Sequence, residues 1–189
     1  SEKYEAYANA LFEMRKAKGM TLEQAQKTML DPLYYGVMMV KMNEADGMVA
    51  GAINSTANTY RPALQILKTK PGTKLDSSFM IMAVPDCQFG TEGTFLFSDC
   101  GLMENPTADE LSEIAISSAR SFKTLTNIDP IVAMLSYSTY GSAKNPLVDK
   151  VVEATKLAKE KAPDLAIDGE LQLDAAIVPS VGKSKAPAS

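Results

Sequence analysis

A polar segment at residues 54–62 combines hydroxyl groups with the features of an anion site. It follows a short apolar run and precedes a helical pattern. A helix that begins there would present free backbone N–H groups beside Ser55 and Thr56. Arg61 could then hold a phosphate or carboxylate through two parallel hydrogen bonds. The pattern predicts an anion site, and the alternative is that the hydroxyls only cap the helix and that Arg61 is solvated.

A second hydroxyl-rich segment covers residues 136–144, directly after the apolar run at residues 131–135. Its hydroxyl side chains are Ser136, Tyr137, Ser138, Thr139, Tyr140 and Ser142. In α/β sheets, ligands gather beyond the carboxyl ends of the strands. Such a loop binds phosphate in some proteins and forms an ordinary turn in others, so both interpretations stay open.

The composition excludes several kinds of chemistry. The sequence has no histidine, which removes histidine-activated nucleophiles and histidine metal sites. For the two cysteines, Cys87 and Cys100, we expect inert thiols in a reducing cytoplasm rather than a disulfide or a metal site. A net charge of −4 argues against nucleic acid as a partner. The apolar run at residues 33–40 is far shorter than the ~20 residues of a membrane span, so no membrane partner is expected.

The first part of the chain is predicted to be mainly helical. Apolar residues three and four apart predict a helix over residues 4–18, and capping signals mark further helix ends. These signals are Gly19, Thr21 with Gln24, and Asp31 followed by Pro32. Residues 47–53 are small and apolar, as in a buried parallel strand. A helix is expected over residues 59–69.

The second part alternates strands with helices. Strands are predicted over residues 78–84, 94–98, 131–135 and 165–167, and the run at 131–135 is expected to be buried. Helices are predicted to begin at Thr107, through a capping box with Glu110, and at Asn145 followed by Pro146. Val148, Val151, Val152 and Leu157 are expected to face inward on the latter. Asp168-Gly169 is expected to form a turn, although the nearby carboxylates of Glu170 and Asp174 could also pair.

The alternation predicts an α/β fold with a parallel or mixed sheet flanked by helices. Pro71 and Gly72 lie at the centre of the best candidate boundary, residues 68–74. We therefore expect residues 1–72 to form part of a first α/β domain and residues 73–189 to form a second one that is incomplete at its C-terminus. Because both ends of the chain are abrupt, an internal piece of a longer protein is expected.

Five segments, taken together, resemble the motifs of the phosphate acetyltransferases (phosphotransacetylases). They are Asn54-Ser55-Thr56-Ala57-Asn58-Thr59-Tyr60-Arg61-Pro62, Ser98-Asp99-Cys100-Gly101 with Asn105-Pro106-Thr107, Met134-Leu135-Ser136-Tyr137-Ser138-Thr139 with Gly141-Ser142, Asp168-Gly169-Glu170-Leu171-Gln172-Leu173-Asp174-Ala175-Ala176, and Lys183-Ser184-Lys185-Ala186-Pro187. The motifs occur in the family's order over nearly the whole chain. Five collinear motifs argue against a chance resemblance.

The resemblance implies a two-domain fold like that of isocitrate and isopropylmalate dehydrogenases, with the active site in the cleft between the domains. It implies exchange of acetyl-CoA and phosphate with acetyl phosphate and CoA, by direct attack in a ternary complex. Coenzyme A is then a substrate, with no tightly bound cofactor and no metal. A homodimer in the cytoplasm that serves acetate metabolism is expected.

The resemblance also implies roles for individual residues. Arg61 resembles the arginine that contacts phosphate or the acyl carbonyl, and Arg15 resembles a second active-site arginine suited to the phosphates of CoA. Cys87 resembles a cysteine near the cleft that is not a nucleophile. The hydroxyls expected to contact the substrates are those of Ser55, Thr56, Ser136, Ser138 and Thr139.

The family's pattern continues beyond the last of these motifs into a segment that supplies a serine, an arginine and a catalytic aspartate base. We therefore expect this chain alone to show little or no turnover. Three alternatives remain. One is a phosphate butyryltransferase, which differs mainly in the size of the acyl pocket; the others are a module that binds CoA or another anion without catalysis and a regulatory or assembly domain.

Overall fold

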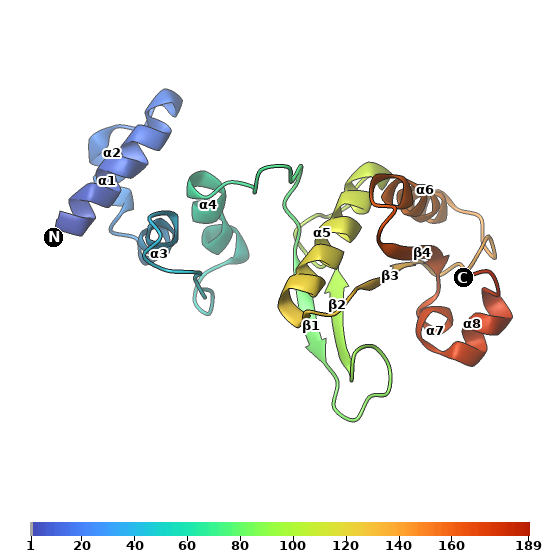
Figure 1. The fold of residues 1–189 in the computed structure, drawn as a ribbon. Helices are drawn as coiled ribbons and strands as arrows, with labels where there is room; N and C mark the ends of the chain where they lie inside the picture. The colour runs from blue at the N-terminus through green and yellow to red at the C-terminus, as the bar shows by residue number, and fades with distance from the viewer. Residues whose placement is uncertain (1) are drawn as a thin grey trace. The chain divides into compact units, whose positions relative to one another are not determined.

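The computed structural model describes residues 2–189. The chain forms two compact units, one ending at Pro71 and the other covering Gly72–Ser189. Figure 1 shows the elements of both, and each unit is described by itself.

The first unit is helical. Its elements are α1 (Glu2–Arg15), the 3₁₀ helix η1 (Lys16–Lys18), α2 (Leu22–Thr28), α3 (Pro32–Lys41) and α4 (Thr56–Ile66). The predicted caps are confirmed, because Gly19 ends η1 with a φ of 84°, Thr21 forms a reciprocal capping box with Gln24, and Asp31 accepts from the N–H of Leu33. Each cap satisfies backbone groups that the helix itself leaves free.

The core of this unit lies among α1, α2, α3 and the end of α4. Its buried side chains are Tyr7, Ala8, Leu11, Ala25, Met29, Val37, Met38 and Ile66. The rings of Tyr7 and Tyr35 tilt against each other with centroids 4.9 Å apart. This packing brings α3, which carries Tyr35, against α1.

The strand expected at residues 47–53 is wrong. These residues form irregular backbone, and Val49 and Ile53 are 103% and 97% exposed. A strand needs a neighbour for its backbone hydrogen bonds, and none of the strands in residues 2–189 pairs with this segment. The helix that follows exists but begins at Thr56 rather than residue 59, because Ser55 caps it by accepting from the N–H of Asn58.

The second unit contains strands and helices, which confirms the α/β class. The strands are β1 (Phe79–Ala83), β2 (Thr94–Ser98), β3 (Ile131–Leu135) and β4 (Ala166–Leu171), and the helices are α5 (Ala108–Thr126), α6 (Pro146–Lys161), α7 (Leu173–Ile177) and α8 (Pro179–Lys185). The strands form two small sheets rather than one: β1 pairs antiparallel with β2, and β3 pairs parallel with β4. Figure 1 shows the two pairs as separate ribbons flanked by helices.

The main core of the second unit lies between α5, α6 and the β3–β4 sheet. Its buried side chains are Ala115, Ile116, Met134, Ala154, Ala158, Ala162 and Ile167. The ammonium of Lys161, on α6, reaches α5, where it donates to Asp109 at 2.5 Å and to Glu113 at 2.8 Å. The predicted capping box of α5 at Thr107 and Glu110 is confirmed.

Three details of this unit differ from the sequence expectation. Ile131 is 90% exposed, so the start of β3 is not buried, and Val152 is exposed rather than inward-facing. Asp168 and Gly169 do not form a turn, because β4 continues through them and pairs them with Ala133 and Met134. A β-carbon at Gly169 would lie 2.6 Å from the carbonyl oxygen of Met134, so only glycine fits this close approach of two strands.

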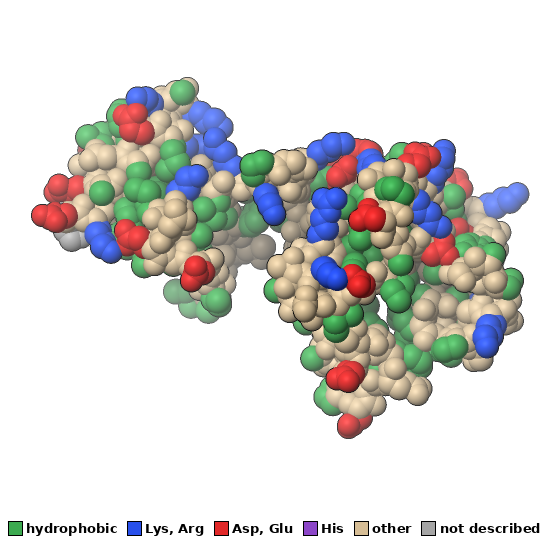
Figure 2. Space-filling model, viewed as in Figure 1, with side chains coloured by type: hydrophobic (Ala, Val, Ile, Leu, Met, Phe, Trp, Pro, Cys, Tyr) green, Lys and Arg blue, Asp and Glu red, His purple; other side chains and the backbone are tan. Residues whose placement is uncertain are grey.

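The surface mixes charges. On the face in Figure 2, basic and acidic side chains alternate with hydrophobic ones on each unit. None of the helices in residues 2–189 has the length and apolar character needed to cross a membrane.

Candidate functional site

Arg15 is the last residue of α1, where a cation is stabilised by the helix dipole. Its side chain is half-buried. Its Nε is buried and has no hydrogen-bond partner among residues 2–189. Since an unpaired buried donor is costly, an acceptor placed against this guanidinium would be bound favourably.

Arg61 lies one turn into α4 and is exposed. Gln65 follows four residues later, so both side chains lie on one face of the helix. At the start of the same helix, Ser55 is the capping residue and Thr56 is the first helical residue, and both are exposed. A helix therefore begins within residues 54–62 as expected, but its N-terminus is at Ser55 and Thr56 and not beside Arg61, which lies five residues beyond Thr56.

Tyr34, on α3, bonds to the helix that carries Arg61. Its hydroxyl donates to Oε1 of Gln65 at 3.0 Å. Burial and, more weakly, the carboxylate of Asp31 raise the pKa of the phenol, whereas the positive charges of Arg61 and Arg15 act to lower the pKa. Both guanidinium groups therefore lie within electrostatic reach of one hydroxyl, although α1 and α4 are separated by about 40 residues of chain.

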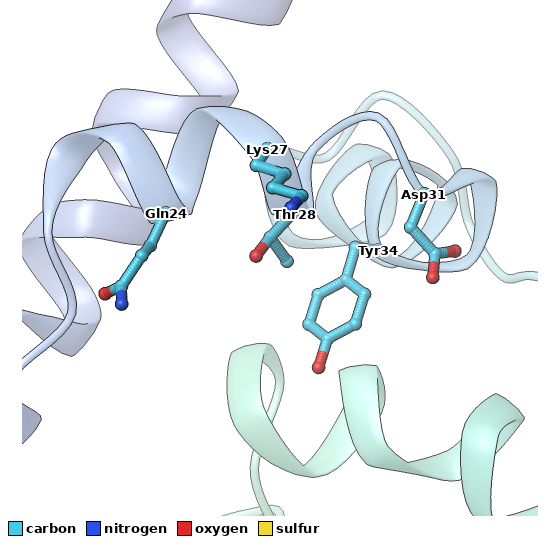
Figure 3. A pocket seen from close by; sticks show the side chains of 5 residues that line it. All are labelled: Gln24, Lys27, Thr28, Asp31 and Tyr34. Carbon is cyan, nitrogen blue, oxygen red and sulfur yellow. The ribbon is translucent and has the colours of Figure 1, made fainter.

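A shallow hollow adjoins Tyr34. It has a volume of about 350 Å³ and is lined by Gln24, Lys27, Thr28, Asp31 and Tyr34. Figure 3 shows these side chains, with the phenol of Tyr34 pointing away from its own helix and towards the next one. The hollow thus offers one cation, one carboxylate and several hydrogen-bonding groups.

The hydroxyl loop after β3 lies in the second unit. Ser138 and Thr139 are buried, and their hydroxyls bind protein groups. The Ser138 hydroxyl donates to Oε1 of Glu170 at 3.0 Å, and that of Thr139 accepts from the N–H of Gln172 at 2.9 Å. Both side chains therefore hold the loop to the end of β4.

Ser136 and Tyr137 are the outward members of this loop. Tyr137 is 59% exposed and Ser136 is half-buried. The Ser136 hydroxyl accepts from the N–H of Ser138 at 3.2 Å. Because β3 and β4 are parallel, the loop lies at the carboxyl edge of their sheet, where α/β proteins bind ligands.

Cys87 is a half-buried free thiol in the loop between β1 and β2, and Cys100 is also free. The Cys87 sulfur lies 3.9 Å from the carbonyl oxygen of Phe89. Among the described residues, no cluster of three or more cysteine, aspartate or glutamate side chains is arranged to hold a metal ion.

The carboxylates of the 168–174 segment do not pair with one another. Asp168 binds the ammonium of Lys159 at 2.8 Å and accepts from the hydroxyl of Tyr140, and Asp174 binds Lys185 at 2.8 Å. Burial acts to raise the pKa of Asp168, but hydrogen bonds, led by that of Lys159, lower the pKa to about 2. The carboxylate of Asp168 therefore stays ionised and holds the side chains of Lys159 and Tyr140.

A sequence model described as phosphate acetyl/butaryl transferase matches residues 1–189. The chain belongs to this family. The phosphate acetyltransferase of Acetivibrio thermocellus is 70% identical over the whole chain, which covers 57% of that relative. The enzyme of the same name from Thermoanaerobacterium thermosaccharolyticum is 57% identical, with 58% of its length covered.

Solved structures of the phosphate acetyl/butaryl transferase family agree with this assignment. A phosphotransacetylase from Streptococcus pyogenes is 49% identical, with a TM-score of 0.81 over the whole chain and 54% of that structure. The EutD phosphotransacetylase of Staphylococcus aureus is 44% identical, with a TM-score of 0.83 over 97% of the chain and 54% of that structure. The chain therefore spans a little over half the length of these relatives.

Sequence reasoning missed the contacts of two residues, one in each unit. Tyr34 and Glu170 make their contacts 31 and 32 residues away in the sequence. No local pattern marks such a contact, because neither residue caps a helix or repeats a spacing. The signals available in the sequence were a tyrosine and a glutamate beside apolar residues, since a buried polar side chain needs a hydrogen-bond partner.

Proposed function

We propose that the protein is a phosphate acetyltransferase, which exchanges acetyl-CoA and phosphate with acetyl phosphate and CoA. The observation that carries the proposal is the match of the chain to the phosphate acetyl/butaryl transferase family, together with the exposed Arg61 on the helix that Tyr34 holds through Gln65. An exposed guanidinium suits an anionic substrate. The name shared by the most similar relatives supports the acetyl group as the one transferred.

The reaction is a direct attack in a ternary complex. The thiolate of CoA attacks the carbonyl carbon of acetyl phosphate, a C–S bond forms, the C–O bond to phosphate breaks, and phosphate leaves with the electron pair. Negative charge develops on the carbonyl oxygen and on the leaving phosphate, and fixed cations stabilise both. A base must also accept the thiol proton, and none of the residues assigned here has that role.

Arg61 is assigned to the phosphate group or the acyl carbonyl oxygen, and Arg15 to the phosphates of CoA. Exposure of Arg61 and the unpaired Nε of Arg15 support these roles. Ser55 and Thr56 would contribute hydroxyls at the start of α4.

For the loop after β3, we assign Ser136 to substrate contact. Ser138 and Thr139 then hold the loop in place rather than contact the substrate, since their hydroxyls already bind Glu170 and Gln172. Cys87 is assigned a place near the cleft without a covalent role.

The wider proposals rest on the family resemblance. The unit ending at Pro71 and the unit Gly72–Ser189 would belong to the two domains of a fold like that of isocitrate and isopropylmalate dehydrogenases. The protein would be a cytoplasmic homodimer of acetate metabolism, with CoA as a substrate and no tightly bound cofactor.

The test is phosphate-dependent release of CoA thiol from acetyl-CoA, measured with the complete protein. We expect turnover that requires phosphate and is faster with acetyl-CoA than with butyryl-CoA. Faster turnover of butyryl-CoA would make the protein a butyryltransferase. A folded protein that binds CoA in a calorimetric titration but releases no thiol would support a binding module instead.

A further inference from the structure

The contact between Tyr34 and Gln65 links α3 to the helix that carries Arg61. The hydroxyl of Tyr34 donates to Oε1 of Gln65 at 3.0 Å, in a partly buried position. Gln65 and Arg61 lie one helical turn apart on the same face of α4. Anything that fixes Gln65 therefore also fixes the direction in which Arg61 leaves the helix.

The apolar packing of α4 does not fix that direction by itself. Pro62 and Ile66 are the buried residues of the helix, and Ile66 joins the core of the first unit. Apolar burial is non-directional, so it holds the helix against its neighbours but tolerates small rotations about the helix axis. A hydrogen bond weakens steeply when its angle or length changes, and it resists such rotations.

A phenol suits this position better than a charged acceptor or donor would. A carboxylate here would pair with the guanidinium groups and cancel the charge that an anionic substrate needs. The phenol of Tyr34 is neutral near pH 7 already at its ordinary pKa of 10.0, and burial raises that pKa further. Its bond to Gln65 therefore holds α4 without adding a negative charge near Arg61.

We propose that Tyr34 is a positioning residue for acetyl transfer, which sets the rotation of α4 through Gln65 and so aims Arg61 at the phosphate group of the substrate. This proposal rests on the proposed function for its chemistry. It assigns Tyr34 no contact with the reacting atoms. Any effect of Tyr34 on phosphate binding or acetyl transfer must therefore act through the position of Arg61.

The experiment compares Tyr34→Phe, Gln65→Met and their double variant in the complete protein. The dissociation constant of inorganic phosphate is measured by calorimetry, and kcat and KM for phosphate are measured with acetyl-CoA. The same Tyr34→Phe change is also made in an Arg61→Ala background. Tyr35→Phe is the matched control, because Tyr35 lies on the same helix and packs against Tyr7.

We expect Tyr34→Phe to weaken phosphate binding by about tenfold, as for the loss of one well-placed hydrogen bond, with a melting temperature near that of the unchanged protein. Gln65→Met should have the same effect, and the double variant should be no worse than either single one. In the Arg61→Ala background, Tyr34→Phe should change nothing further. Tyr35→Phe should leave phosphate affinity unchanged.

Unchanged phosphate affinity in Tyr34→Phe would overturn the proposal. So would a further loss in the Arg61→Ala background, since the effect would then not pass through Arg61, and so would a complete protein that binds no phosphate. A protein that binds phosphate without turning over acetyl-CoA would refute the proposed function alone. The affinities of the variants would still decide the role of Tyr34.

Discussion

The hydroxyl of Ser138 donates a hydrogen bond to Oε1 of Glu170 at 3.0 Å, and both side chains are buried. The same carboxylate oxygen accepts from the backbone N–H of Gly141 at 2.7 Å. One buried carboxylate thereby holds the hydroxyl loop after β3 against the last residues of β4. Such a contact is costly to break, because it leaves buried donors without an acceptor.

Replacing Glu170 by Ala should lower the free energy of unfolding by about 3 kcal/mol, since Ser138 and Gly141 both lose their acceptor. Glu170→Gln should be milder, because its amide oxygen can still accept. Urea unfolding measures the loss, and amide hydrogen exchange over residues 136–143 locates it. The control is Glu160→Ala on the exposed face of α6; equal exchange in the two alanine variants would contradict the anchoring role.

The fold should lose stability in acid through Asp168. The pKa of this carboxyl is lowered from 3.8 to about 2 by hydrogen bonds that outweigh its burial. Because the pKa in the folded state lies below the ordinary value, the stabilisation is present above about pH 4 and is lost as the pH falls towards 2. Its size at neutral pH should be about 1 kcal/mol after allowance for solvent screening.

The measurement is the difference in free energy of unfolding between the unchanged protein and Asp168→Asn, at pH 7, 4 and 2.5. The difference should shrink as the pH falls below about 4, since the carboxyl of the unfolded state takes up its proton first and that of the folded state follows only near pH 2. Asp164→Asn, in the exposed turn before β4, should show no such trend. A difference that is constant across this range would mean that the ion pair with Lys159 contributes nothing.

The hairpin of β1 and β2 should depend on Gly93. Its φ is 79°, and a β-carbon there would lie 2.2 Å from the carbonyl oxygen of Val84. Gly101 has a φ of 93° but open space around it. Gly101→Ala should therefore cost about 1 kcal/mol for the left-handed backbone alone, and Gly93→Ala should cost at least about twice as much.

Thermal unfolding and hydrogen exchange over residues 79–98 distinguish these two variants. Loss of protection in the hairpin is expected for Gly93→Ala and not for Gly101→Ala. Equal losses would show that the close approach to Val84 is not what requires glycine.

Local signals in the sequence predicted the helix ends well. Thr21 with Gln24 and Thr107 with Glu110 form their capping boxes as expected, because a cap depends on residues three positions apart. The helix that carries Arg61 is capped in the same way, but by Ser55, so it begins three residues earlier than expected.

Contacts between segments that are far apart in the sequence could not be predicted from such local signals. A strand at residues 47–53 was expected from apolar composition, but a strand forms only against a partner, and the described chain gives that segment none. Asp168 and Gly169 were expected to form a turn, but their pairing with β3 makes them part of β4. The bond from Tyr34 to Gln65 requires α3 and α4 to pack together, and no spacing in the sequence encodes it.

The central claim is that Arg61 stabilises the transition state of acetyl transfer. The most direct measurement is thioester formation from acetyl phosphate and CoA by the complete protein, with Arg61→Ala beside Arg120→Ala, an exposed arginine of α5. We expect Arg61→Ala to lose about 3 kcal/mol of transition-state stabilisation, roughly a hundredfold in rate, and Arg120→Ala to match the unchanged protein. Equal rates in all three proteins would contradict the account.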